Sequence, residues 1–514
     1  MPEANRTLLP SALPFLLPLV RARAAFFTDA NGEPHAELCA ADGGHVLRLR
    51  SDAFRAWVDR AWYERTSDVA PPEERRRVFS LLEGVARYEG PRRDVHVRLA
   101  EHEGAVYLDL GGPGRQVARV DGTGWRIEER SPVAFARPPT LLPIARPTAG
   151  GSIDSLHDLF PRLSRSAFRL VAGWLVGALR PKGPYPILIL SGERGSGKST
   201  LARMLKLLVD ASKAPLRSMP KGERDLAIAT SRSWVGVYDN LAPLGAPMSD
   251  ALCRISTGGG LGTRKLFTDL DEVVLELSRP LVLTGIEDVA TRPDLCERAI
   301  VVKLPPVPPE GRRDEGSLLR RFEAVAPGLL GALLDGVSAA LADWRREGPE
   351  RLPRMADFAR WVSLAEPALG WEPGSFVRTY ERHRSDCDLD AIEHDPVAPL
   401  VLRLPGLVES GRWAGTATEM WIVLTHLAER SGPKPAGWPR APNKITGHLR
   451  TAAPLLRAHG VEIGTERTST SRVLVVTRRS PAPTASADTL AVPDDDGRSL
   501  ERSSNVQLPE RMSQ

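Results

Sequence analysis

Apolar and polar positions alternate along this chain with two different periods, and the changes of period mark its parts. Between residues 152 and 306, short apolar runs alternate with segments of helical spacing. The apolar runs predict four buried strands, at 187–190, 234–238, 281–284 and 299–303. Strands that alternate with helices favour a parallel sheet with helices on both faces. The predicted fold class of this region is therefore α/β.

The region before the α/β module, which is the name used here for residues 152–306, mixes both periods. Helical spacing relates four large apolar residues, Phe54, Trp57, Val58 and Trp62. Alternating runs at 95–99 and 106–110 predict paired strands. Residues 1–145 are therefore predicted to form an α+β N-terminal region. The stretch 137–151 is rich in proline and ends in glycines, which predicts a linker.

The region after the module is helical at first. Residues 316–400 keep a helical period and predict a helical segment. Residues 405–478 predict helix, helix and strand pair, which is the order of a winged helix. The first of these helices begins with a capping pattern at Thr416 and Glu419. The tail 480–514, rich in Pro, Ser, Ala and Asp, predicts disorder.

The first central strand runs into a glycine-rich loop of the form G-x-x-x-x-G-K-[ST], the pattern of a phosphate-binding loop. Glycines let backbone N–H groups approach a phosphate, and the following helix adds its positive end. We expect Lys198 to reach the β- and γ-phosphates and the Ser199 hydroxyl to ligate Mg²⁺. The residues expected to hold ATP are Gly192, Gly195, Gly197, Lys198, Ser199 and Thr200.

Two further strands end in polar residues that complete this predicted site. Asp239 follows the second strand, where a P-loop fold places the acid that holds Mg²⁺ through water. The next residue is Asn240, which orients water but accepts no proton. Slow hydrolysis, the use of another acid, and binding without hydrolysis all remain open. Thr284 ends the third strand and is expected to lie beside the loop as a sensor of the γ-phosphate.

Basic residues mark other candidate contacts. A glycine-rich turn and the strand after it predict a hairpin that points Arg264 or Lys265 at a phosphate backbone, or else an ordinary surface hairpin with a solvated basic tip. Arg298 begins the last strand, where a ring ATPase presents an arginine finger to its neighbour. The alternatives are that Arg298 pairs with Asp294, or that Arg292 is the finger.

The C-terminal helix pair is basic as well. The second helix, 442–458, carries Lys444 and Arg450, and Arg472 lies in the turn that follows. Such residues would meet DNA phosphates and give affinity without base specificity. The alternative is a solvated basic face on a domain that contacts protein.

Composition narrows the possible partners and the compartment of the protein only slightly. The 514 residues carry a net charge of +5, which permits a nucleic-acid partner without demanding one. Four scattered cysteines form no C-x-x-C pair and fit a reducing, cytoplasmic compartment. An apolar run at 8–20 is too short to span a membrane and contains prolines, so we interpret it as an element packed on the first domain. No membrane partner is expected.

A complete primase would need clustered carboxylates for its metal ions. The best-placed carboxylate of the N-terminal region, Asp109, stands alone in its strand, and Asp29, Asp42 and Asp94 are dispersed. His35 and His45 flank Cys39 without convincing metal-ligand spacing. We therefore predict no polymerase chemistry here, and a separate primase could supply synthesis.

Taken in order, these motifs resemble the superfamily 3 helicase-like AAA+ ATPases of phage and mobile-element primase-helicases of the poxvirus type, and related actinobacterial ATP-binding proteins. The resemblance rests on the loop at 192–199 and on six later residues, Asp239, Asn240, Arg264, Thr284, Arg292 and Arg298. It implies a P-loop AAA+ module in a ring, a homohexamer, with ATP between subunits and DNA in the channel. It further implies that Lys198, Ser199 and Asp239 bind MgATP, that Arg298 acts in trans, and that Arg264 or Lys265 lies on the channel hairpin. Asn240 and Thr284 depart from the family pattern.

The predicted function is an ATP-dependent DNA helicase or translocase of a phage or mobile-element replication system, acting on single-stranded or forked DNA. The alternative is a nucleotide-gated initiator or loader that binds DNA and hydrolyses little ATP, which Asn240 favours. A third reading is a signalling or defence ATPase with protein partners.

Overall fold

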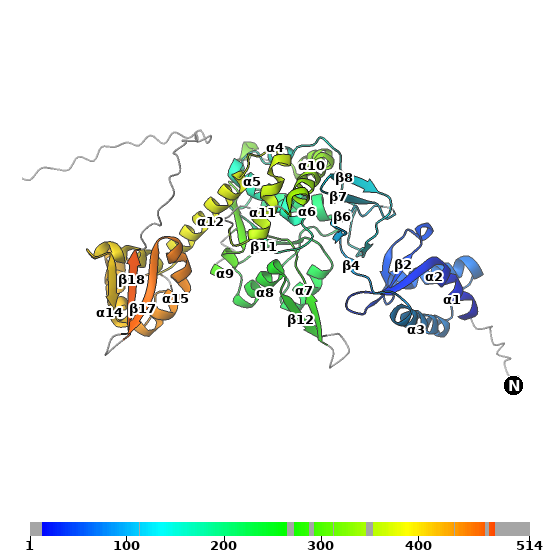
Figure 1. Cartoon of the computed structure of the whole chain (residues 1–514), viewed down its shortest axis with the longest axis horizontal. Helices are drawn as coiled ribbons and strands as arrows, with labels where there is room; N and C mark the ends of the chain where they lie inside the picture. The colour runs from blue at the N-terminus through cyan, green and yellow to red at the C-terminus, as the bar shows by residue number, and fades with distance from the viewer. Residues whose placement is uncertain are drawn as a thin grey trace, which may run out of the picture. The chain divides into compact units, whose positions relative to one another are not determined.

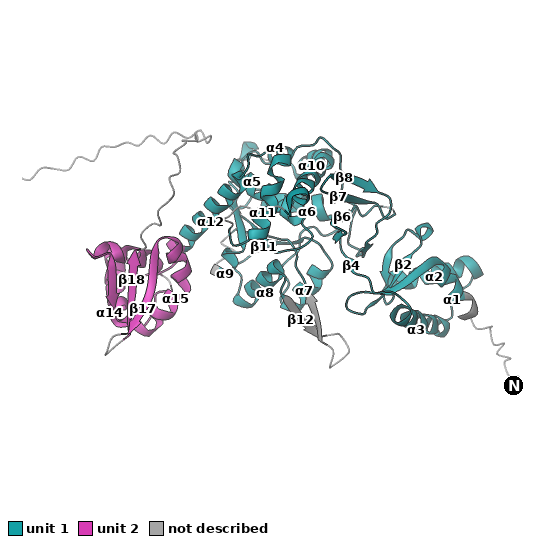
Figure 2. Ribbon diagram, in the orientation of Figure 1, with its two compact units in different colours: residues 1–391 teal, residues 392–514 magenta. Residues whose placement is uncertain are grey.

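The computed structural model describes residues 13–112, 114–264, 272–286, 292–311, 313–345, 353–435, 437–467 and 472–478. The chain is a mixed α/β protein with two compact units, Met1–Ala391 and Ile392–Gln514 (Figures 1 and 2). Lys265, the tail 480–514 and the start of the apolar run at 8–20 lie outside the described residues.

A four-stranded parallel sheet lies at the centre of unit 1. Its order is β11–β14–β10–β15, and the strands span Ile187–Ser191 (β10), Gly236–Leu241 (β11), Leu281–Gly285 (β14) and Ala299–Lys303 (β15). All four strands lie where the apolar runs predicted them. In β10, Leu188 and Leu190 join one hydrophobic core, whereas Ile187 and Ile189 join another. Because side chains alternate along a strand, each face of the sheet needs its own cover.

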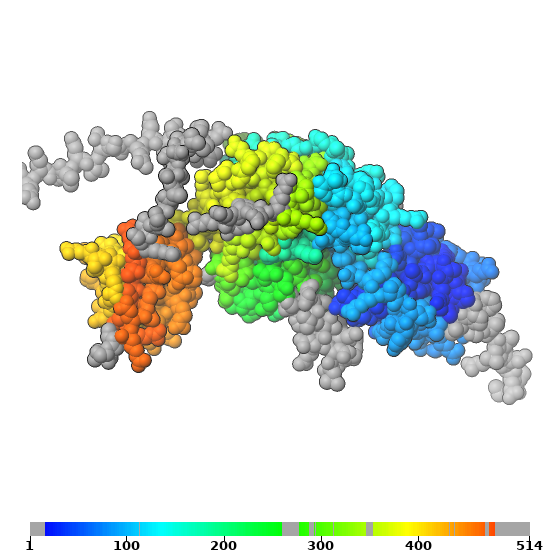
Figure 3. All heavy atoms as spheres, viewed as in Figure 1, coloured from blue at the N-terminus to red at the C-terminus, as the bar shows by residue number. Residues whose placement is uncertain are grey.

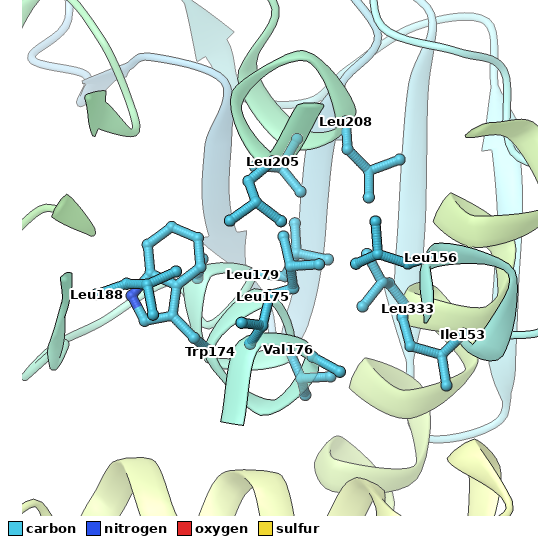
Figure 4. Close-up of a cluster of buried hydrophobic side chains, with 14 of the residues drawn as sticks. Ile153, Leu156, Trp174, Leu175, Val176, Leu179, Leu188, Leu205, Leu208 and Leu333 are labelled. Atoms are coloured by element: carbon cyan, nitrogen blue, oxygen red, sulfur yellow. The ribbon is translucent and has the colours of Figure 1, made fainter. Parts of the chain in front are cut away.

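Helices cover both faces, as predicted. The larger core includes residues of α4 (Asp154–Leu159), α5 (Arg165–Ala178), α6 (Lys198–Asp210), α10 (Glu315–Asp343), α11 (Ala356–Ala365) and α12 (Ser375–His394). Figure 4 shows part of this core, with Trp174, Leu188, Leu205 and Leu333 converging from different elements. The other face is covered by α7 (Glu223–Ser231), α8 (Ala246–Thr257) and α9 (Pro293–Cys296).

Helix α10 is the one helix of the described residues that is long and apolar enough to cross a membrane by length and composition alone. Its most apolar window is 61% buried inside the protein. The buried side chains include Leu329, Leu330, Leu333 and Leu334, which belong to the larger core. Packing in this core accounts for the apolar composition of α10.

The first part of unit 1 is a small α+β lobe. Its elements are α1 (Leu13–Arg23), β1 (Ala24–Thr28), β2 (Pro34–Leu38), β3 (Val46–Arg48), α2 (Asp52–Thr66) and α3 (Pro72–Tyr88), with an antiparallel sheet ordered β1–β2–β3. Leu16 and Val20 of α1 are fully buried in the core of this lobe. The described part of the N-terminal apolar run is therefore an element packed on the first domain, as the sequence suggested.

An antiparallel meander follows, and here the sequence prediction was partly wrong. The meander is β5–β6–β7–β8, with bounds Leu99–His102, Ala105–Asp109, Val117–Asp121 and Gly124–Glu128, and β4 (Val95–His96) pairs instead with β9 (Ala134–Phe135). The run at 95–99 is thus two strands. Arg98 lies between the two strands and interrupts the extended run, because its backbone is left-handed at φ 64°. Its side chain is fully buried. In the space-filling view the cyan meander lies beside the yellow-green α10 (Figure 3). A hydrogen bond joins the two, from Trp125 Nε1 to Asp335 Oδ1 at 2.9 Å.

The stretch predicted as a linker is packed against α10. Thr148 N donates to Pro327 O at 3.0 Å, which places the chain along the helix where proline interrupts it. A Cβ at Gly151 would meet the Gly328 carbonyl oxygen at 2.1 Å, and one at Gly331 would meet Thr148 O at 1.9 Å. Glycine is needed at both positions because the backbones touch, and a free linker would have no such requirement.

Unit 2 contains α13 (Ala398–Arg403), β16 (Arg412–Gly415), α14 (Ala417–Ser431), α15 (Pro442–Ala458), β17 (Val461–Arg467) and β18 (Arg472–Arg478). The strands form an antiparallel sheet ordered β16–β18–β17. Helix α14 begins with a complete capping box between Thr416 and Glu419, as predicted. The sequence missed α13 and β16, so the predicted order of helix, helix and strand pair was incomplete.

Candidate functional site

The loop between β10 and α6 is built from glycines in conformations that other residues rarely adopt. Gly192, Gly195 and Gly197 have φ values of 142°, 78° and 88°. A Cβ at Gly192 would also meet the Leu304 carbonyl oxygen at 2.5 Å. Helix α6 begins at Lys198, as predicted, and Thr200 lies in its first turn. The first amides of a helix have no partner within the helix, so this end of α6 offers N–H groups to an anion.

The Lys198 amine lies against the loop itself. Its Nζ donates to Gly192 O at 2.7 Å and to Glu193 O at 2.6 Å. Burial lowers the pKa of this amine, and the nearby Asp239 carboxylate opposes that shift. A cation is thereby held at the mouth of the loop, where a phosphate on the loop amides would be within its field.

A short hydrogen-bond chain joins the ends of three elements at this point. Ser199 Oγ donates to Asp239 Oδ1 at 2.8 Å, and the Thr284 hydroxyl donates to the same oxygen. Asn240 N in turn donates to Thr284 Oγ1 at 2.9 Å. The structure thus brings together Lys198, Ser199, Asp239, Asn240 and Thr284, which lie far apart in sequence. Thr284 lies beside the loop strand, in register with Leu190.

These residues fit a magnesium–nucleotide pair. A hydroxyl and a carboxylate in contact are oxygen ligands of the kind that Mg²⁺ takes, together with phosphate oxygens and water. A cavity of about 420 Å³ opens beside Asp239 and Asn240. Asn240 has a left-handed backbone, at φ 57°, which asparagine tolerates better than most residues. Among the residues that line this cavity, Asp239 is the one acid.

Arg298 lies away from this cluster. Ala299 pairs with Ile187 at the start of β10, whereas the loop follows the end of β10. Arg298 is therefore at the opposite end of the parallel strands from Lys198. Its Nη1 donates to the Asp294 main-chain oxygen at 2.8 Å, so the bond falls on the carbonyl rather than the carboxylate. Arg292 pairs with the Asp294 carboxylate at 3.2 Å and with Asp250 at 3.1 Å.

The candidate DNA contacts fall into two places. Arg264 ends β12 (Gly260–Arg264), which pairs in antiparallel register with β13 (Glu272–Glu276), so a hairpin is present as predicted. In unit 2, Lys444 and Arg450 are exposed on α15, and Arg472 is exposed at the start of β18. Helix α15 contains no acidic residue.

Asp109 serves the structure of the meander. Its carboxylate accepts two hydrogen bonds from the guanidinium of Arg137, one of them from Nε at 2.9 Å, and a third from Gly111 N at 3.0 Å. Arg137 also donates to Gly112 O and Gly114 O. The Asp109 carboxylate is therefore occupied by neighbours that hold the turn after β6.

Two residues beside the loop gave no signal in the sequence. Arg217 lines the cavity at Asp239, because its backbone bonds to Val237 and Asp239 of β11. Phe160 approaches the loop from the segment between α4 and α5: a Cβ at Gly197 would lie 3.8 Å from its ring. Neither belongs to a motif, and only the fold places them near the site.

Comparison with known proteins gives two family matches. Residues 153–381 match the actinomycete integrative conjugative element replication protein, AICE RepA, and residues 397–489 match the AICE RepA C-terminal domain. No curated protein matches the chain. Among solved structures, an A-form apo structure of the NrS-1 C-terminal region is similar, with a TM-score of 0.42, 12% identity, and coverage of 90% of this chain and 98% of that chain. Another apo structure of that region has a TM-score of 0.41 at 12% identity, and covers 91% and 100% of the two chains. Both matches are to the same family, so over these two stretches the chain is similar to a replication protein of an actinomycete integrative conjugative element.

Proposed function

We propose that the loop at 192–200 binds MgATP and that the chain is an ATP-dependent DNA helicase or translocase in the replication of its mobile element. The observation that carries this proposal is the contact of Ser199 with Asp239 at 2.8 Å beside the Lys198 amine. A glycine-rich loop next to an acid on another strand of the same sheet is the arrangement that phosphoryl transfer from a nucleotide requires.

Each residue of the cluster has a distinct task in this proposal. Gly192, Gly195 and Gly197 let the loop amides face the phosphates, and Lys198 adds a positive charge to the terminal phosphates. Ser199 and Asp239 would hold Mg²⁺, which when bound supplies charge neutralisation on the phosphate oxygens. Thr200, in the first turn of α6, would lie at the same phosphates. Asn240 and Thr284 orient water and Asp239 by hydrogen bonds.

The proposal includes a ring of identical subunits, a homohexamer as the resemblance implies. Arg298 lies at the end of the strands opposite the loop of its own chain, which is compatible with its acting on a nucleotide bound by a neighbouring subunit. In the ring, the hairpin carrying Arg264 and Lys265 would meet single-stranded or forked DNA. The exposed Lys444, Arg450 and Arg472 of unit 2, the domain predicted from the sequence to be a winged helix, would hold the duplex. A separate primase would supply synthesis.

Unwinding of a forked duplex tests this function. The full chain with ATP and Mg²⁺ should separate the strands, and Lys198→Ala should abolish separation. An exposed lysine of the same unit, Lys213→Ala, is the matched control and should unwind as the wild type does. Wild-type protein that binds the fork and never separates it would contradict a helicase.

A nucleotide-gated initiator or loader is the second candidate, and Asn240 favours it. The position after Asp239 offers no proton acceptor, and among the described residues that line the cavity there Asp239 is the one acid. The signature of this candidate is ATP-dependent assembly on DNA with little turnover and no strand separation.

A further inference from the structure

A second cavity, of about 780 Å³, is lined by the loop between β10 and α6. Its floor is the loop itself, from Arg194 to Gly197, with Thr200 of α6. Its volume is within the range of about 300–1,000 Å³ that is typical of small-molecule sites. A nucleotide whose phosphates lie on the loop would extend its remaining atoms into the nearest open space, and this cavity adjoins the loop directly.

Two walls of the cavity are apolar and fixed by their own hydrogen bonds. One wall is the turn between α4 and α5, which carries Phe160 and Leu163; Leu163 N donates to Phe160 O at 3.0 Å, and His157 Nε2 bonds to Leu163 O at 2.9 Å. The facing wall is the segment after β15. Leu304 N donates to Ser191 O at 2.8 Å, and Pro305 and Val307 continue the wall. These walls are in place without a ligand.

The charged side chains at this cavity are all arginines. Arg162, Arg194 and Arg313 are exposed, and the other polar side chains among the described lining residues are the hydroxyls of Ser196 and Thr200, with no carboxylate, carboxamide or imidazole. Ser196 is buried, and its hydroxyl is engaged by Lys198. Arginine attracts phosphates and stacks on aromatic faces, but it offers no acceptor to the edge of a base.

We propose that this cavity holds the base and ribose of the nucleotide, with Phe160 as the stacking residue, and that it accepts a purine by stacking and shape without reading its edge. The proposal rests on the nucleotide site proposed above. Every base has a π-face, so a stacking contact tolerates a change of base. A pocket without edge hydrogen bonds cannot reject an analogue by the factor of about 10⁴ or more that a hydrogen-bonding pocket reaches. The substrate class is therefore purine nucleoside triphosphates, adenine and guanine alike.

Binding measurements on the full chain test this directly. The probes are non-hydrolysable analogues of ATP and GTP with Mg²⁺, and inorganic tripolyphosphate, which has no base. The dissociation constants of the two analogues should agree within about tenfold. Phe160→Leu, which keeps an apolar side chain and removes the ring, should weaken both by about tenfold and leave tripolyphosphate binding unchanged. Tyr88→Ala, an exposed aromatic on α3, should change none of the three.

Two results would overturn the proposal. One is a preference for ATP over GTP above about a thousandfold, which only edge recognition provides. The other is Phe160→Leu binding both analogues as the wild type does, while Lys198→Ala binds neither. If Lys198→Ala binds all three probes like the wild type, the nucleotide site itself is elsewhere, and the proposed function fails together with this inference.

Discussion

At the residue scale, Thr284 joins the ends of β11 and β14. Its hydroxyl donates to Asp239 and accepts from Asn240 N at 2.9 Å. The side chain therefore acts on the acid that would hold Mg²⁺, in addition to the sensor role that the sequence suggested. Within the described residues, the side-chain donors to that carboxylate are Ser199 Oγ and Thr284 Oγ1.

Replacing Thr284 by Val tests this positioning role. Valine has nearly the same shape and neither donates nor accepts, so Asp239 loses a charge-assisted hydrogen bond of about 1.5 kcal/mol. We expect the Mg²⁺ concentration that half-saturates ATP turnover to rise about tenfold, since about 1.4 kcal/mol is a factor of ten. Thr284→Ser keeps the hydroxyl and should need no more Mg²⁺ than the wild type. An unchanged Mg²⁺ requirement in Thr284→Val would show that Asp239 is held by other means.

Arg98 is a buried residue with a different task. Its Nε pairs with Asp210 Oδ1 at 3.1 Å, and its other nitrogens donate to Asp109 O, Leu142 O and Ala211 O. Burial alone would raise the pKa of Asp210, but Lys206 and Arg98 together hold that pKa below its usual range. Arg98 thereby ties the meander to the last turn of α6, the helix that begins at Lys198.

Substitution of Arg98 by Met should cost much of the stability of unit 1. The change leaves a buried carboxylate short of a partner and strands main-chain carbonyls, which is typically worth about 3–5 kcal/mol. Denaturant titration of the full chain measures this loss. Arg60→Met, at an exposed ion pair with Glu64, is the control and should change the free energy of unfolding by less than about 1 kcal/mol. A small loss for Arg98→Met would mean that water replaces the guanidinium.

The sequence located the loop between β10 and α6, because a local motif specifies it. Lys198, Ser199 and Asp239 lie close together in the structure. It could not predict Phe160 or Arg217, since their places depend on packing between distant segments. The roles assigned to all site residues stay predictions.

At the element scale, α12 closes the free edge of the central sheet. Strand β15 is the edge strand, and its Val301 N donates to Nε2 of His383 on α12 at 3.0 Å. The imidazole must be neutral at Nε2 to accept this bond. Burial is the main cause that lowers the pKa of His383 to about 4, and the neighbouring Arg384 adds to the effect.

The stability of unit 1 should therefore fall in acid. In the unfolded chain the histidine pKa is about 6.5, so between about pH 6.5 and 4 the unfolded state binds a proton that the folded state does not. The free energy of unfolding decreases as pH falls through this window. His383→Gln supplies an amide oxygen that accepts from Val301 and does not titrate, so its pH dependence should be flatter. His102→Gln, at an exposed position, should follow the wild-type curve. Equal slopes for His383→Gln and the wild type would contradict this account.

Elements with strong periodicity were predictable and short polar ones were not. The four buried strands, α2, α6, α14 and α15 all appear where the pattern placed them. Strand β16 has four residues, and two of them are exposed, so it lacks an apolar signature. The break at Arg98 could not be predicted for another reason. Arg98 has a left-handed backbone, and its ion-pair partner, Asp210, is distant in sequence.

At the scale of the whole molecule, the order of the predicted regions agrees with the structure better than the boundaries between them. The meander was expected to belong to an N-terminal region, yet Leu99, Val106 and Leu108 share the core of the central sheet. Contacts of this kind join residues more than two hundred positions apart, as between Trp125 and Asp335. No local pattern encodes them, so domain limits drawn from composition stay approximate.

Unit 2 is predicted to hold DNA through phosphate contacts. Replacing Lys444, Arg450 and Arg472 by Ser removes exposed cations, and each phosphate contact contributes about 0.9 to the slope of log affinity against log salt on duplex DNA. The triple variant should bind duplex DNA more weakly and with a slope shallower by about 2–3. Salt titration of DNA binding measures it, with the surface triple Arg55, Arg60 and Arg76 to Ser on α2 and α3 as control. An unchanged slope would favour a protein partner for this face.

The most direct test of the central claim is ATP turnover by the full chain, with and without single-stranded DNA, with Lys198→Ala as the blank. We predict turnover that DNA stimulates and that Lys198→Ala abolishes, because the loop at 192–200 would hold the nucleotide and couple it to DNA. Turnover that persists in Lys198→Ala would contradict the nucleotide site. Tight ATP binding with negligible turnover in both conditions would contradict a motor and assign the chain to the nucleotide-gated initiators.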